Sequence, residues 1–173
     1  MKQTSDCSRI FFGALLLFCC FTLFIALSSE AASDNLITNP GFETGTAPWY
    51  FYTNGAGTFA NDAAGSNSPR AAHISITTQG TNVQLYQAGL PLQDNTKYRL
   101  SFKGKSNTGH DVAISVLKHG SPYTNYGLNA YAFNLTTTWQ SYMVEFTTSG
   151  FTGTVNDGRL MFWIAPYDAA GDQ

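Results

Sequence analysis

The fold is decided by residues 82–105, which read NVQLYQAGLPLQDNTKYRLSFKGK. Apolar and polar side chains alternate in 98–103 and again in 83–86, and a period of two is typical of a strand with one buried face. Between these runs, Pro91 and the pair at 94–95 favour a turn. The stretch therefore predicts two antiparallel strands, paired with each other, with an apolar face and a face of amide, phenol and cationic groups.

The remainder of the chain continues this pattern. Further alternating runs fall at 71–77, 112–116, 139–147 and 160–164, and a loop is expected at 119–129. No stretch shows the period of 3.6 residues that a helix requires. Strands separated by turn residues about every eight to fifteen positions indicate an all-β fold of two antiparallel sheets, a β-sandwich or jelly roll.

The first 32 residues have the features of a secretory leader. Lys2 and Arg9 precede an apolar run over 10–27, and small residues follow at 29–32. This pattern predicts a helical signal peptide over 1–32, although the apolar run is also long enough for an uncleaved anchor. Cleavage leaves one domain, 33–173, that is secreted or displayed at the cell surface and has no membrane segment.

Composition narrows the classes of function. All three cysteines, Cys7, Cys19 and Cys20, fall in the leader, so we expect no disulfide and no cysteine metal site in the exported part. The formal net charge is −2 and no basic stripe is present, which argues against nucleic acid as a partner.

Three segments together carry a family resemblance. They are NLITNPGFE at 35–43, read as a short strand that runs into a turn, the 83–102 stretch, and Thr138-Trp139-Gln140 before the strand at 142–146. In order and spacing they resemble the family 4/9 carbohydrate-binding modules, which are galactose-binding-like β jelly rolls. The resemblance implies a non-catalytic module that holds a polysaccharide, a β-glucan or xylan-like chain, for an attached or partner glycoside hydrolase.

The resemblance raises two further expectations. Family members usually finish with a strand that ends in paired aspartates, and this sequence stops before such a segment, so we expect the last strand to be lacking. Many members also hold a structural calcium ion between an early acidic residue and that strand. Glu43 matches the early residue, and its alternative role is that of a capping or surface carboxylate.

The candidate sugar-binding side chains are aromatic rings, which pack on the C–H face of a pyranose, and polar groups, which bind its hydroxyls. The candidates lie on the polar face of the central strands, in the loop that borders the expected cleft, and on the last strand. They are Gln84, Tyr86, Arg99, Lys103, Tyr123, Tyr126 and Trp163. Alternatively, Arg99 and Lys103 are solvated surface charges, and Tyr123 and Tyr126 anchor the loop. Tyr86 and Trp163 would then pack against neighbouring parts of the chain.

Catalysis is not expected from this segment. His73, His110 and His119 are scattered without metal-ligand spacing, and the few acidic residues lie mostly in predicted turns. Glycoside hydrolysis needs two carboxylates that flank a cleft, and no such pair is evident. The alternative function is that of a cell-surface structural or adhesion domain that binds protein.

Overall fold

The computed structural model describes residues 35–165 and 167–173, which form nine strands and contain no helix that could cross a membrane. The predicted signal peptide lies outside the described residues. The strands are β1 (Tyr50–Thr53), β2 (Ala56–Ala63), β3 (Ala71–Thr78), β4 (Val83–Gln93), β5 (Lys97–Gly104), β6 (Val112–Lys118), β7 (Asn125–Phe133), β8 (Gln140–Thr147) and β9 (Thr154–Trp163).

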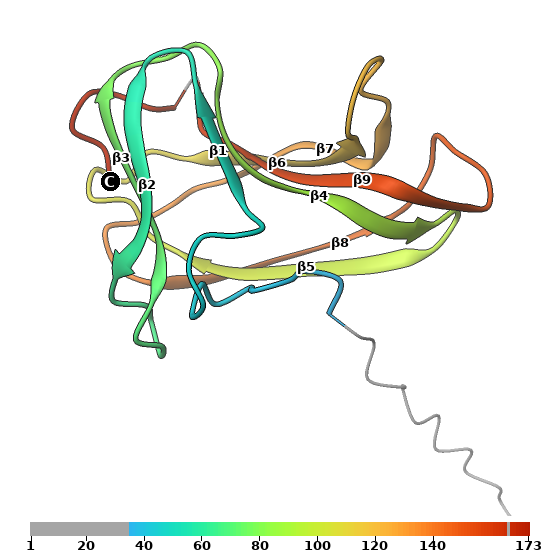
Figure 1. Ribbon diagram of the computed structural model, residues 1–173, viewed down its shortest axis with the longest axis horizontal. Helices are drawn as coiled ribbons and strands as arrows, with labels where there is room; N and C mark the ends of the chain where they lie inside the picture. The colour runs from blue at the N-terminus through green and yellow to red at the C-terminus, as the bar shows by residue number, and fades with distance from the viewer. Residues whose placement is uncertain (1–34, 166) are drawn as a thin grey trace, which may run out of the picture. The chain divides into compact units, whose positions relative to one another are not determined.

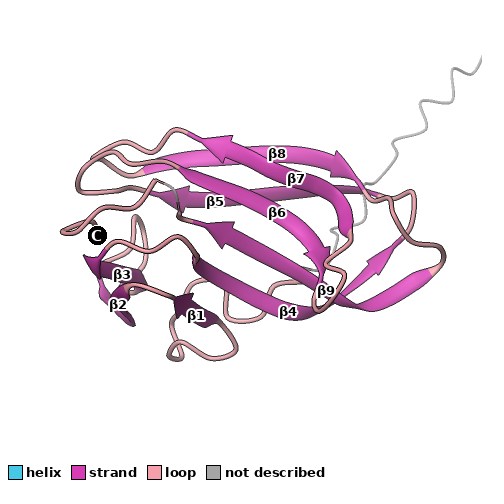
Figure 2. Cartoon of the chain, turned by 90° about the horizontal axis from the view of Figure 1, so that it is seen from above, coloured by secondary structure: helices cyan, strands magenta, loops and turns pink. Residues whose placement is uncertain are grey.

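The strands form a β-sandwich, as the alternation predicted. One layer is a five-stranded antiparallel sheet in the order β1-β4-β9-β6-β7. Figure 1 shows the β5–β8 pair as a second layer beneath this sheet, with the β2–β3 pair closing one end. Figure 2 gives the same arrangement from above.

The predicted pairing of the two central strands is wrong. β4 pairs with β1 and β9, whereas β5 pairs with β8, so the turn between β4 and β5 carries the chain from one layer to the other. The predicted faces are nevertheless those observed, because each strand turns its apolar side toward the other layer. Phe102 of β5 meets Phe162 of β9 edge-on, with ring centroids 5.3 Å apart.

The core lies between the layers. Ile114 and Leu160 are almost fully buried in the five-stranded sheet, and Val144 of β8 faces them from the other layer. Burying such side chains contributes about 1.5–3 kcal/mol each, which is the main force that holds the layers together.

The segment before β1 does not form the strand predicted from 35–43. It consists of bends and turns, and its backbone is held by a side chain instead of a ladder. The buried amide of Gln87 accepts a hydrogen bond from Thr38 N (2.9 Å) and donates one to Thr38 O (2.9 Å). A neighbouring strand is therefore not needed to satisfy this part of the backbone.

The chain end lies between β3 and the segment that follows β5. Gly171 N donates to Ile76 O of β3 (2.8 Å), and Asn107 N, three residues after β5, donates to Gln173 O (3.0 Å). In the described part of the chain β3 pairs with β2 alone and β5 with β8 alone. A pocket of ≈ 190 Å³ opens between them, lined by apolar side chains such as Ile74. The expectation of a lacking strand stays a prediction.

Candidate functional site

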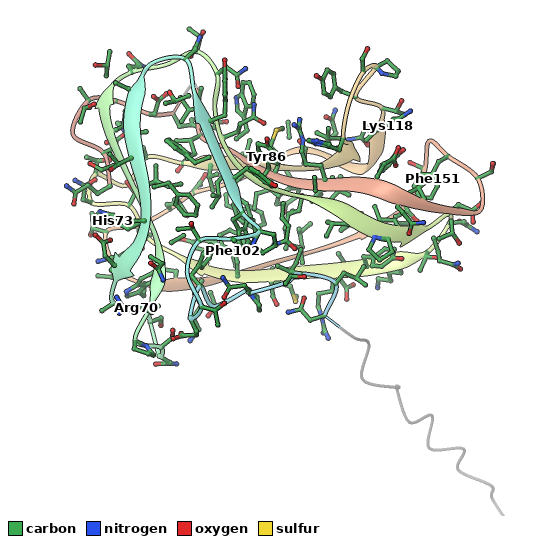
Figure 3. The ribbon with its side chains drawn as sticks, viewed as in Figure 1. Arg70, His73, Tyr86, Phe102, Lys118 and Phe151 are labelled. Carbon is green, nitrogen blue, oxygen red and sulfur yellow. The ribbon has the colours of Figure 1, made fainter. Side chains whose placement is uncertain are left out.

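The outer face of the five-stranded sheet, which points away from the core, gathers aromatic and polar side chains. Tyr50 on β1 lies opposite Tyr86 on β4, which lies opposite Met161 on β9. Two residues away along each strand, Tyr52, Gln84 and Trp163 lie side by side in the same way. In Figure 3, Tyr86 lies on the far side of β4 from Phe102, which fills the space between the layers.

Three rings form an aromatic row on this face. Tyr50 and Tyr86 are stacked, with centroids 5.4 Å apart and planes inclined by 19°. On its other side Tyr86 lies 5.8 Å from the His119 ring, inclined by 32°. Tyr50 is 57% exposed and Tyr52 49%. Exposed rings that lie together on one face, as these do, mark a surface that can receive a ligand.

The loop over 119–124 rises beside this row, between β6 and β7 (Figure 1). Backbone hydrogen bonds fix both of its ends, from Lys118 N to Thr124 O (2.8 Å) and from His119 N to Asp157 O (2.7 Å). Tyr123 at its tip is 57% exposed and has a φ of 57°. A bulky residue is uncommon in that left-handed region and is found there mainly where the surrounding loop imposes it.

Two polar side chains complete the outer face. Gln84 is buried, donates from Nε2 to Asn82 Oδ1 (2.7 Å), and has an Oε1 with no hydrogen-bond partner among the described residues. The Arg159 guanidinium lies 5.0 Å from the Tyr86 ring centroid and 5.6 Å from that of Tyr123. Burial lowers the pKa of Arg159, and its Nε has no partner in the described chain.

The face therefore combines a platform of rings with a few fixed donors and acceptors. A pyranose presents an apolar C–H face, which packs on an aromatic ring, and a rim of hydroxyls, which needs directed hydrogen bonds. Both kinds of group are present on one surface, which holds three of the four exposed aromatic side chains in the described residues.

Comparison with known proteins identifies the family. The sequence profile of CBM_4_9, described as "Carbohydrate binding domain", matches residues 34–169. The chain belongs to this carbohydrate-binding family. No curated protein sequence matches it significantly.

Solved structures of carbohydrate-binding modules share the fold of this domain. One described as "CBM4 structure and function" has a TM-score of 0.61 at 20% identity and covers 79% of this chain and 92% of its own. The N-terminal cellulose-binding domain of Cellulomonas fimi β-1,4-glucanase C has a TM-score of 0.58 at 21% identity, with 80% and 90% covered. A family 16 carbohydrate-binding module gives 0.54 at 22% identity, with 80% and 93% covered.

Four of the seven predicted site residues of this carbohydrate-binding domain come together on the outer face. They are Gln84, Tyr86, Tyr123 and Trp163. Trp163 is partly buried, since it also packs against the small apolar cluster of Val83 and Ala165. Their role in binding stays a prediction.

Arg99 and Lys103 do not share a surface with these residues, contrary to expectation. Both lie on β5 in the other layer, because β5 pairs with β8 and not with β4. Arg99 is exposed opposite Glu145. Lys103 donates to Ser66 Oγ (3.4 Å) and lines the pocket between β3 and β5.

Tyr126 is not a loop residue at the edge of the outer face. β7 begins at Asn125, and Tyr126 is only 3% exposed. Its ring packs against Phe151 with centroids 4.5 Å apart, and its hydroxyl donates to Asp157 Oδ1 (3.0 Å). Burial and this hydrogen bond raise the pKa of Tyr126. The contact anchors β7 next to Asp157, whose carbonyl holds the 119–124 loop.

The sequence prediction missed four outer-face residues: Tyr50, Tyr52, His119 and Arg159. A signal existed for Arg159. The predicted last strand began at residue 160, whereas β9 begins at Thr154, and alternation with Met161 and Trp163 would have placed Arg159 on the same face. The tyrosines alternate with Phe51 in the same manner, but their pairing with β4 could not be read from the sequence.

The predicted calcium ligand lies away from this face. Glu43 is exposed, and its Oε1 accepts a hydrogen bond from Ser68 Oγ. Within the described residues no group of three or more histidine, cysteine, aspartate or glutamate side chains could hold a metal ion. Calcium also accepts backbone and amide oxygens as ligands, so the ion stays a prediction.

Proposed function

We propose that this domain is a secreted, non-catalytic module that binds a polysaccharide, a β-glucan or xylan-like chain, along the outer face of the five-stranded sheet. The observation that carries the proposal is the stacked pair of Tyr50 and Tyr86, which presents exposed ring surface beside Gln84 and Arg159. Family membership supplies the general class of ligand.

The arrangement suits a chain more than a single sugar. The aromatic row runs from Tyr50 on β1 across Tyr86 to His119 beyond β6, so it crosses several strands. Successive sugar rings could then pack on successive aromatic rings.

The choice of a β-glucan as one candidate ligand is supported by a structural neighbour. The Cellulomonas fimi domain of the same fold is a cellulose-binding domain and belongs to a β-1,4-glucanase. By analogy, we propose that the present domain works with an attached or partner glycoside hydrolase. Holding that enzyme beside its polymer raises the effective concentration of substrate without a new catalytic group.

Affinity gel electrophoresis tests the proposal. The chain is run through gels that contain soluble β-glucan, xylan or mannan, and we expect retardation by at least one of the first two. Tyr86→Ala should clearly reduce the retardation. Tyr131→Ala is the matched control, because Tyr131 is 48% exposed but lies opposite the buried Ile114, on the inner side of the sheet.

Unchanged mobility of the wild-type chain in all three gels would overturn the proposal and favour a domain that binds protein. Equal retardation of the wild type and Tyr86→Ala would place the glycan on another surface. Circular dichroism of each variant checks that the β-sandwich is intact.

A further inference from the structure

Arg159 has an unusual position for a cation. It lies on β9 in the middle of the five-stranded sheet, flanked by Ala88 of β4 and Leu117 of β6. Its guanidinium is partly buried and lies within cation–π distance of Tyr86 and Tyr123. Cations on sheets usually reach into water, so a guanidinium held against two rings at the centre of a sheet calls for an explanation.

The charge of Arg159 has no acidic partner within the described residues. The ion pairs there are Lys97 with Glu145, His73 with Asp62, and His110 with Asp172. The hydrogen bond that Arg159 makes is a long one, from Nη2 to the Met161 sulfur at 3.6 Å. Its Nε is buried without a partner. A desolvated charge of this kind destabilises the free protein unless something of opposite charge compensates for it.

The nearest acidic residue in sequence does not provide this compensation. The Oδ1 of Asp157 accepts a hydrogen bond from the hydroxyl of Tyr126 on β7. The rings of Tyr86 and Tyr123 lie against the Arg159 guanidinium, and no ion pair in the described chain joins it to a carboxylate. The outer face therefore carries a positive charge although the whole chain has a formal net charge of −2.

We propose that Arg159 makes this face select glycan chains that carry a carboxylate, that is, chains containing a uronic acid. This inference rests on the proposed function and names the class of ligand for the same site. A guanidinium binds a carboxylate with two parallel charge-assisted hydrogen bonds, a geometry that a neutral hydroxyl cannot match. The neighbouring rings of Tyr86 and Tyr123 exclude water from the pair and pack on the sugar that bears the acid.

Pairs of ligands that differ by the carboxylate alone provide the test. Calorimetry compares cello-oligosaccharides with their C6-oxidised counterparts, and xylo-oligosaccharides with the same chains carrying a glucuronic acid. In at least one pair the acidic member should bind about tenfold more tightly at low ionic strength, as expected for one charge-assisted bidentate contact. The difference should shrink as salt is added.

Variants assign the preference to one residue. Arg159→Gln should bring the acidic and neutral members to within about twofold of each other, whereas Arg159→Lys should retain part of the difference because it keeps the charge. Arg99→Gln removes one positive charge from the other layer and should leave the preference unchanged. The Tm of each variant checks its folding.

Two results would overturn the inference while the proposed function stands. One is a neutral member that binds as tightly as its acidic counterpart in both pairs, and the other is an acid preference that survives in Arg159→Gln. Failure of both members of both pairs to bind the wild type would overturn the inference and the proposed function together.

Discussion

The ring of Tyr50 stacks on that of Tyr86 across the β1–β4 ladder, with centroids 5.4 Å apart. The two residues are 36 positions apart in the chain, and their contact depends on the register between an edge strand and its neighbour. Because Tyr50 is 57% exposed, the pair offers ring surface to solvent in place of filling the core. The aromatic row on the outer face begins at this contact.

Loss of the edge ring should weaken glycan binding without unfolding the domain. Tyr50→Ala removes one platform and the neighbour that orients Tyr86, so we expect an affinity loss of about 1 kcal/mol, or about fivefold. Calorimetry with the retarding glycan measures it. In a double-mutant cycle with Tyr86→Ala, the two losses should not be additive. Full additivity would show that the two rings act independently.

Tyr126→Phe should affect stability more than binding. The substitution removes the donor to Asp157 Oδ1 inside a nearly closed environment, at a cost of about 1–2 kcal/mol in the free energy of unfolding. Urea unfolding gives the change, and glycan affinity should stay within about twofold because the ring itself is retained. A large loss of glycan affinity at unchanged stability would show that Tyr126 takes part in binding.

Gln87 should be one of the main polar contributors to stability. Its amide makes both a donated and an accepted hydrogen bond with Thr38 and is 2% exposed. Gln87→Ala leaves both backbone groups of Thr38 without their partner, so we expect a loss of about 2–3 kcal/mol in urea unfolding. Gln93→Ala is the matched control, since Gln93 is exposed and bonds Thr154 Oγ1. Equal effects of the two substitutions would contradict this account.

The chain end should loosen in acid. Burial alone raises the pKa of Asp172, but hydrogen bonds from His110, Thr108 and the Ala169 amide outweigh burial and hold that pKa below 3.8. The folded state thus favours the charged form. Its stabilising contribution is present above pH 3.8 and is lost as the pH falls through the lower, folded-state pKa.

Hydrogen exchange of the Ile76 and Asn107 amides reports on this change, because both donate to carbonyls of the chain end. Their protection should fall in acid, and Asp172→Asn should show low protection at all pH values. Protection that is independent of pH in the wild type would show that Asp172 does not hold the segment.

The faces of the strands could be predicted from the sequence, whereas their partners could not. Alternation correctly put Leu100 and Phe102 inside and grouped Gln84 with Tyr86, because side-chain direction is a local property of extended backbone. Pairing depends on the path of the turns. The turn after β4 could have closed a hairpin, but it leads into the other layer, and this removed Arg99 and Lys103 from the expected site.

The remaining errors arose at strand boundaries. Tyr126 was expected in the loop at 119–129, yet it is the second residue of β7. Arg159 was overlooked because its strand starts earlier than the apolar run that marked it. A strand end that is polar has no hydrophobic pattern, so only the ladder with β4 and β6 reveals it.

The central claim is that a glycan lies on the outer face of the five-stranded sheet. Its most direct test is ¹H–¹⁵N NMR of the chain during titration with an oligosaccharide of the glycan that retards it. The account predicts that the Trp163 indole, the Gln84 side-chain amide and the backbone amides around Tyr86 shift, while those of Arg99 and Lys103 do not. Shifts that cluster on β5 and β8, with the Trp163 indole unmoved, would contradict it.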